Sequence, residues 1–157
     1  MEIVQLPPNV AKVPKNFRCL LIGPSEAGKS TWLASLIKNK ATVFQQPGYA
    51  KFIYCSPNLG ESALSSHADL NYKNSLKEWA EPVEMVFVDH ILTEEELFEE
   101  ANATAGRVLL IVDDFSQEMF STDLVYRLFT RLSSHGIGID TCLSLHQGAA
   151  SKAFGKW

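Results

Sequence analysis

The sequence has few cysteines, few arginines and no long apolar run. Its three cysteines are Cys19, Cys55 and Cys142, and no two of them form a CxxC pair. We therefore expect buried free thiols in a reducing compartment instead of a disulfide scaffold or a zinc site. No stretch approaches the roughly 20 apolar residues that cross a bilayer, and the first eight residues lack the basic and apolar parts of a signal peptide. These absences predict an intracellular, soluble protein without a membrane partner.

The composition is that of a folded domain, with 46% hydrophobic and 20% charged residues. A disordered or low-complexity chain is excluded, and a length of 157 residues suits a single core. The net charge of −4 hides an uneven distribution. Residues 1–51 hold seven Lys or Arg side chains against two carboxylates, whereas residues 52–157 hold seven against sixteen. The basic first third predicts either a surface for nucleic acid or polyphosphate or an ordinary solvated surface, and the sequence leaves both open.

Apolar runs alternate with amphipathic segments along most of the chain. We expect an extended arm over residues 1–16, which carry three prolines, and one core over residues 17–157. Short apolar runs predict strands at 17–22, 52–55, 83–88, 107–112 and 139–145. Apolar residues at helical spacing predict helices at 29–39, at 93–101 and from about residue 122. This alternation predicts an α/β fold with a mostly parallel sheet flanked by helices.

Two further features refine these boundaries. Thr93 and Glu96 have the spacing of a capping box that opens the helix at 93–101, and Gly106 is expected to end that helix. Residues 59–82 are polar, and we expect them to be mostly irregular, with one helical turn near Trp79.

A phosphate-loop pattern follows the first predicted strand. Gly23 to Ser30 match G-x-x-x-x-G-K-[ST] without departure, between a predicted strand and a predicted helix. In such a loop the backbone N–H groups face phosphate oxygens, Lys29 supplies a positive charge to the β- and γ-phosphates, and Ser30 offers a hydroxyl to Mg²⁺. The sequence thus predicts ATP and Mg²⁺ as ligands; the alternative is an ordinary glycine-rich turn before a helix. The candidate binding residues are Gly23, Pro24, Ser25, Glu26, Ala27, Gly28, Lys29, Ser30 and Thr31.

Two carboxylates follow the most apolar run of the chain. Asp113 and Asp114 come directly after the predicted strand 107–112, which we expect to lie next to the strand of the phosphate loop. P-loop nucleoside triphosphatases hold Mg²⁺ with a carboxylate at this position, so we assign Asp113 to the metal. In strand geometry Asp114 points away from Asp113, and we expect it to be the general base for a water aligned on the γ-phosphate. The alternative is an Asp pair that only ends a strand.

Other polar residues are expected near the same site. Gln147 follows the predicted strand 139–145 and is expected to contact the γ-phosphate or the attacking water, with His146 as the lesser candidate. Arg127 and Arg131 lie one helical turn apart, and they are either structural or able to reach the nucleotide of a neighbouring subunit. Arg18 and Arg107 begin predicted strands, at the edge opposite the nucleotide, which excludes them. These are the only four arginines in the chain.

A resemblance to a known family is carried by five segments: Leu20–Ser30, Ile53–Ser56, Leu109–Phe115, Leu128–His135 and Leu143–Gln147. Together they resemble the HerA-FtsK-type packaging ATPases of large double-stranded DNA viruses, a group that includes poxvirus relatives and the virus-like Polinton (Maverick) and adintovirus elements. The last two matching segments resemble the family's L-F-T-[KR]-G-S-H-H stretch and its sensor strand. Leu132 and Gly148 replace residues that the family usually has, and the chain stops at Trp157, before the family's further strand.

The resemblance implies a RecA-like (ASCE) P-loop ATPase core, without the last strand of the family, that packages double-stranded DNA into a viral capsid. It also implies capsid or portal-site partners, a homo-oligomeric ring, and a location at assembly sites in the host cytoplasm or nucleus, or in the virion. In such a ring we expect Arg131 to act on the γ-phosphate of a neighbouring subunit, with Arg127 as the second candidate. The alternatives are a small nucleoside or nucleotide kinase, for which no arginine-rich lid is visible, and a nucleotide-binding remnant without turnover.

Overall fold

The described residues form an α/β fold in which strands and helices alternate. The computed structural model describes residues 12–24, 27–62, 64, 66–115, 122–130 and 138–145. The strands are β1 (Arg18–Ile22), β2 (Tyr49–Cys55), β3 (Glu84–Val88), β4 (Arg107–Val112) and β5 (Ile139–Leu145). The helices are α1 (Lys29–Lys38), α2 (Lys40–Val43), α3 (His67–Ala80), α4 (Glu94–Ala103) and α5 (Thr122–Thr130).

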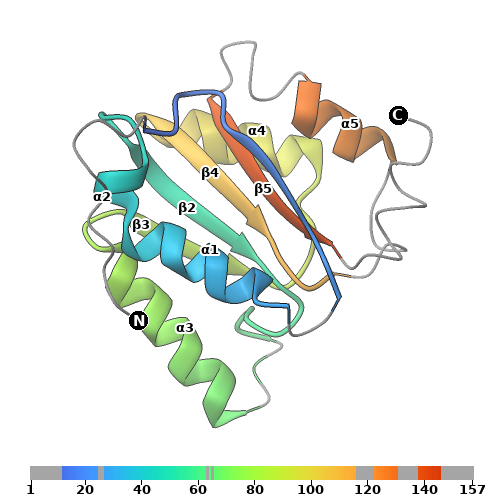
Figure 1. The fold of residues 1–157 in the computed structure, drawn as a ribbon. Coiled ribbons are helices and arrows are strands. Elements are labelled where there is room, and N and C mark those ends of the chain that lie inside the picture. The colour runs from blue at the N-terminus through green and yellow to red at the C-terminus, as the bar shows by residue number, and fades with distance from the viewer. Residues whose placement is uncertain are drawn as a thin grey trace.

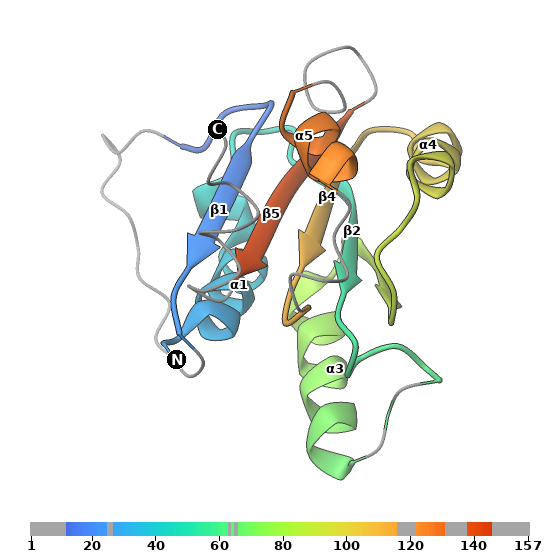
Figure 2. The same cartoon turned by 90° about the vertical axis from the view of Figure 1, so that its right-hand side faces the viewer.

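All five strands pair in parallel, in the order β1-β5-β4-β2-β3 (Figure 1). The chain first moves across the sheet from β1 to β2 and β3, with α1 and α3 on one face. It then returns through β4 to β5, with α4 and α5 on the other face (Figures 1 and 2). A change of direction together with a change of face keeps each crossover right-handed, as parallel sheets require. The prediction of a mostly parallel sheet with flanking helices is confirmed.

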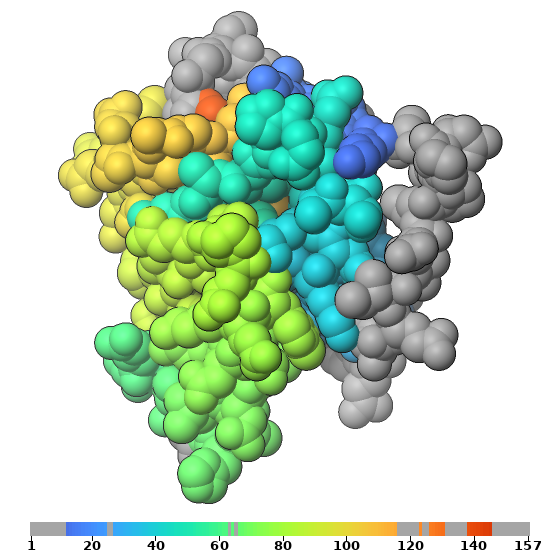
Figure 3. All heavy atoms as spheres, turned by 90° about the vertical axis from the view of Figure 1, so that its left-hand side faces the viewer, coloured from blue at the N-terminus to red at the C-terminus, as the bar shows by residue number. Residues whose placement is uncertain are grey.

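The sheet separates two apolar cores. On one face, Phe52 and Tyr54 of β2 pack with the buried sides of α1 and α3, which lie side by side at the surface (Figure 3). On the other face, Ile53 and Cys55 pack with Leu97 of α4 and with α5. Successive side chains of a strand point to opposite faces, so the near-continuous apolar runs of β2 and β4 supply both cores at once.

The helix α3 corrects the sequence-based expectation that residues 59–82 are mostly irregular. Its amino-terminal cap is Ser66, whose hydroxyl accepts a hydrogen bond from the backbone N–H of Asp69. Its buried side is narrow, with Leu76 and Ala80 fully enclosed, because most of its other side chains are polar and face solvent. A helix with so few apolar residues has a weak periodic signal, and its stability comes from packing against α1 and the sheet.

The boundaries of α1, α4 and α5 agree closely with the predictions, whereas the short helix α2 was not predicted. The capping box at Thr93 and Glu96 is present in full, with each side chain bonded to the other residue's backbone N–H. Gly106 does not end this helix as expected, because α4 stops at Ala103. Instead, Gly106 takes a positive φ of 138° directly before β4. There a Cβ would lie 2.8 Å from the Cβ of Ala50, so the close approach of β2 also requires glycine.

Part of the predicted arm is attached to the fold. Val13 forms a parallel bridge with Phe44, through hydrogen bonds of 2.8 Å to Val43 and 2.9 Å from Gln45. The three cysteines are free; Cys55 and Cys142 are buried as expected, whereas Cys19 is only partly buried. Within the described residues, no helix has the length and apolar character needed to span a membrane.

Candidate functional site

The predicted phosphate loop connects the end of β1 to the first turn of α1. Gly28 caps the helix in the left-handed conformation, with φ 92° and ψ 14°, and its carbonyl accepts a 2.9 Å hydrogen bond from the N–H of Trp32. Glycine adopts this conformation without the steric cost that a Cβ imposes. The N–H of Gly23 bonds to the last carbonyl of β5, at Leu145, over 3.3 Å. The loop is therefore held at the carboxyl edge of the sheet; Ser25 and Glu26 lie outside the described residues.

Lys29 folds back over the loop from the first turn of α1. Its Nζ donates hydrogen bonds of 2.7 Å to the carbonyl oxygens of Gly23 and Pro24. The ammonium group thus lies against the first two residues after β1. Thr31 is exposed on the same helical turn.

Ser30 and Asp113 are distant in the sequence but lie in contact in the fold. The hydroxyl of Ser30 donates a 2.7 Å hydrogen bond to Oδ2 of Asp113, which follows β4 and is 5% exposed. The sequence-based expectation that β4 lies next to β1 is wrong, because β5 lies between them. The two side chains still meet because α1 packs on the face of the sheet that it covers together with α3, and this places Ser30 beside the carboxyl end of β4.

Asp113 also accepts a hydrogen bond from a residue that the sequence reasoning did not select. The hydroxyl of Tyr54, on β2, donates to the same Oδ2 over 2.7 Å. A second tyrosine, Tyr72 on α3, donates a hydrogen bond from its hydroxyl to the backbone carbonyl of Ser30 over 3.3 Å. Tyr54 lies inside one of the segments that resemble the packaging ATPases, whereas Tyr72 lies in the segment expected to be irregular. The pattern Ser66-x-x-Asp69 was the available signal that a helix begins there.

Burial raises the pKa of both tyrosines further above neutral pH. It raises the pKa of Tyr54 well above its usual range, and the nearby Asp113 carboxylate adds to the rise. Burial also raises the pKa of Tyr72, although the neighbouring Tyr54 hydroxyl lowers it in part. Both hydroxyls therefore remain protonated at neutral pH and remain hydrogen-bond donors.

Asp114 has an environment quite different from that of Asp113. It is exposed, and one of its oxygens accepts a 3.1 Å hydrogen bond from the side-chain amide of Asn58, in the loop after β2. The backbone at Asp114 has a φ of 62°, in the left-handed region. The expectation that Asp114 has strand geometry is therefore wrong, because β4 ends at Val112 and the backbone of Asp114 is left-handed. Asn58 was not selected from the sequence, where nothing distinguishes it from an ordinary loop residue.

The remaining candidates are placed only in part. Arg131, His146 and Gln147 lie outside the described residues. Arg127 lies on α5 and forms an ion pair with Glu94 of α4 in the same chain. This partner gives Arg127 a role in joining two helices on one face of the sheet.

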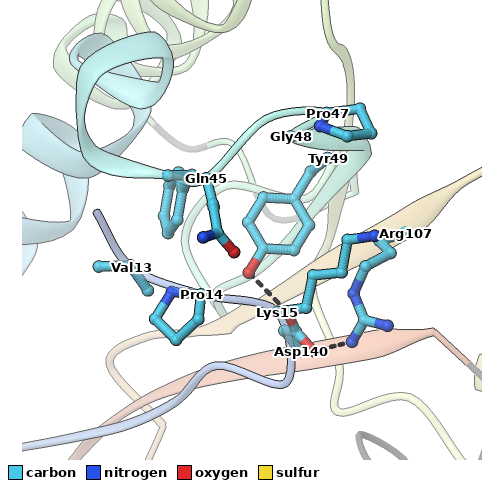
Figure 4. Close-up of a pocket in the computed structure, with 10 residues that line it drawn as sticks. Val13, Pro14, Lys15, Gln45, Pro47, Gly48, Tyr49, Arg107 and Asp140 are labelled. Carbon is cyan, nitrogen blue, oxygen red and sulfur yellow. Dashed lines mark hydrogen bonds and ion pairs between the residues drawn. The ribbon is translucent and has the colours of Figure 1, made fainter. Parts of the chain in front are cut away.

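Arg18 and Arg107 lie at the opposite edge of the sheet, as expected. Figure 4 shows Arg107 and Tyr49 converging on Asp140, which is fully buried on β5. Arg107 pairs with Oδ1 of this carboxylate, and the Tyr49 hydroxyl donates to Oδ2 over 2.7 Å. This cluster joins the starts of β2, β4 and β5, so its role is structural.

Searches against models of known protein families, curated proteins and solved structures found no match to this chain.

Proposed function

We propose that this chain is the core of a P-loop ATPase with a RecA-like fold, which binds ATP with Mg²⁺. The observation that carries the proposal is the 2.7 Å hydrogen bond between Ser30 and Asp113. It links a residue of the phosphate-loop pattern to the first carboxylate after the most apolar strand, across 83 positions of sequence. An ordinary glycine-rich turn gives no reason for this pairing, whereas a nucleotide site needs both groups around one cation.

The donor set suits Mg²⁺. In nucleotide sites this ion is usually bound by one or two carboxylates and the phosphates of the substrate, and not by a complete protein cage. Ser30 and Asp113 offer a hydroxyl and a carboxylate, and the described residues hold no cluster of three or more His, Cys, Asp or Glu side chains suited to a metal. When bound, Mg²⁺ neutralises charge on the β- and γ-phosphates.

The other groups divide the remaining work. Lys29 supplies a positive charge to the phosphates from within the loop, beside the N–H groups at the start of α1. Asp114 accepts a proton from the water that attacks the γ-phosphorus, and Asn58 orients its carboxylate through the 3.1 Å hydrogen bond. The products are ADP and inorganic phosphate. A role in moving double-stranded DNA into a capsid, within an oligomeric ring inside the host cell, rests on the family resemblance alone.

The substitution Lys29→Ala tests nucleotide binding. We expect at least a tenfold loss of ATP affinity with an unchanged unfolding temperature, because Lys29 contacts loop carbonyls and not the apolar core. Isothermal titration calorimetry with ATP and Mg²⁺ measures the affinity, and circular dichroism measures unfolding. Lys38→Ala, on the last turn of the same helix, is the matched control and should bind ATP normally. If a folded Lys29→Ala protein bound ATP with the affinity of the parental protein, the proposal would be contradicted.

A turnover assay then distinguishes an ATPase from the other classes. We expect slow release of phosphate from ATP that increases with added duplex DNA. Phosphoryl transfer to a nucleoside or nucleotide instead of water would identify a kinase, and binding without any turnover would identify a remnant.

A further inference from the structure

Tyr54 is the most enclosed polar side chain near the candidate site. None of its surface is exposed, and it lies among the apolar side chains of the core between the sheet and the helices α1 and α3. Phenylalanine fills such a position equally well apart from the hydroxyl. The hydroxyl therefore needs its own explanation, and its partner is Oδ2 of Asp113 at 2.7 Å.

The register of the sheet explains how this contact arises. Tyr54 pairs with Ile111 on β4, and the N–H of Asp113 extends the same ladder by donating 2.9 Å to the carbonyl of Cys55. Side chains two positions apart on a strand share a face, so Asp113 lies on the face of Ile111 and Tyr54. The tyrosine ring reaches along this face as far as the carboxylate, and its hydroxyl lies at the border between core and site.

The two donors to Asp113 differ in their surroundings. Ser30 lies on the exposed first turn of α1, and its hydroxyl is also the group expected to bind the cation. Tyr54 comes from the central region of the sheet and is held by packing on every side. Of the two, Tyr54 is thus the donor whose position does not depend on whether the cation is present.

We propose that Tyr54 is a positioning residue, which fixes the orientation of the Asp113 carboxylate for binding Mg²⁺. This inference rests on the proposed nucleotide-binding function. It assigns to β2 a part in the site that neither the phosphate-loop pattern nor the Asp pair indicates. Residues that orient a metal ligand from behind commonly change metal affinity about 10- to 100-fold when they are replaced.

The test is the Mg²⁺ dependence of nucleotide binding in Tyr54→Phe. A fluorescent ADP analogue is titrated at a series of Mg²⁺ concentrations and again in excess EDTA. We expect the half-saturating Mg²⁺ concentration to rise about tenfold, with the affinity in EDTA unchanged. Tyr49→Phe is the matched control, because it removes a tyrosine-aspartate hydrogen bond of the same 2.7 Å length from the other end of β2. Its Mg²⁺ dependence should equal that of the parental protein.

A second comparison separates positioning from general damage. In the Asp113→Asn background, adding Tyr54→Phe should produce little further change in Mg²⁺ dependence, because both substitutions affect the same interaction. Parental Mg²⁺ dependence in Tyr54→Phe would overturn the inference and leave the proposed function intact. Loss of folding in Tyr54→Phe but not in Tyr49→Phe would assign the hydroxyl to folding and also overturn it. If the parental protein binds no nucleotide, the proposed function itself fails, and this inference with it.

Discussion

The side-chain amide of Asn58 donates a hydrogen bond of 3.1 Å to the carboxylate of Asp114, whereas Asp113 accepts hydroxyl donors at 2.7 Å. Two adjacent acidic residues thus have different partners and different exposure. This difference predicts that their isosteric replacements have different effects.

Asp113→Asn should weaken Mg²⁺ binding and so raise the Mg²⁺ concentration that nucleotide binding requires. Asp114→Asn should leave nucleotide and Mg²⁺ binding intact and slow hydrolysis. An amide cannot accept the proton of the attacking water, and loss of a general base typically costs about 10²- to 10⁴-fold in rate. Phosphate release measures hydrolysis, and calorimetry at several Mg²⁺ concentrations measures binding. Parental turnover in Asp114→Asn would mean that the base is another group.

Gly60→Ala should destabilise the protein by about 1–3 kcal/mol, because a Cβ at this position would lie 2.3 Å from the Cβ of Asp89 and 2.7 Å from its backbone nitrogen. The matched control is Gly48→Ala, for which the nearest atoms, at 3.6 Å, belong to the flexible end of Gln46. Urea unfolding of both variants gives the free energies. Equal stability of Gly60→Ala and the parental protein would show that the loop after β2 moves away from Asp89 at little cost.

Tyr49→Phe should reduce the loss of stability at alkaline pH. Burial, followed by the hydrogen bond to Asp140, raises the pKa of Tyr49 far above its usual value near 10. Above about pH 10, the usual pKa of tyrosine, the unfolded chain releases the tyrosine proton while the folded protein retains it. The free energy of unfolding therefore falls as the pH rises. One such proton contributes a slope of about 1.4 kcal/mol per pH unit.

The slope is measured by urea unfolding between about pH 9.5 and 11. Tyr49→Phe should be less stable than the parental protein at neutral pH, because it loses a buried hydrogen bond to a charged acceptor. Its slope should nevertheless be shallower by up to one proton. Identical slopes in the two proteins would show that Tyr49 titrates alike in the folded and unfolded states.

The sequence predicted β1, β3, β4 and β5 to within one residue because each is an apolar run with clear ends, whereas β2 begins three residues before the predicted run 52–55, at Tyr49. The β4 run, for example, is bounded by Gly106 and by Asp113, and the observed strand has the predicted limits. The helix α3 was missed because its buried side is formed by only a few apolar residues, among polar side chains such as Asn71 and Lys77. A window of sequence does not show that α1 and the sheet supply the rest of that core.

The sequence pointed to those residues of the candidate site that a contiguous pattern or the end of an apolar strand marks. Lys29 and Ser30 belong to a contiguous pattern, and Asp113 follows a recognisable strand. Tyr54 and Asn58 join them only through the strand order and the loop that follows β2, which depend on contacts between distant parts of the chain. The strand order itself was predicted incorrectly at one point, because local sequence does not show that the last strand is inserted between β1 and β4.

The inserted strand has a mechanical consequence. In the described sheet β1 and β4 share no backbone hydrogen bonds, and each is hydrogen-bonded to β5 instead. A force that pulls the strand of the phosphate loop away from the strand before Asp113 is therefore carried through β5 within the sheet. The outer hydrogen bond of that path, from Gly23 to Leu145, is long at 3.3 Å. The strand before the phosphate loop and the strand before Asp113 are thus coupled through β5 within the sheet, and the hydrogen bond from Ser30 to Asp113 is a second, direct link between the two halves of the site.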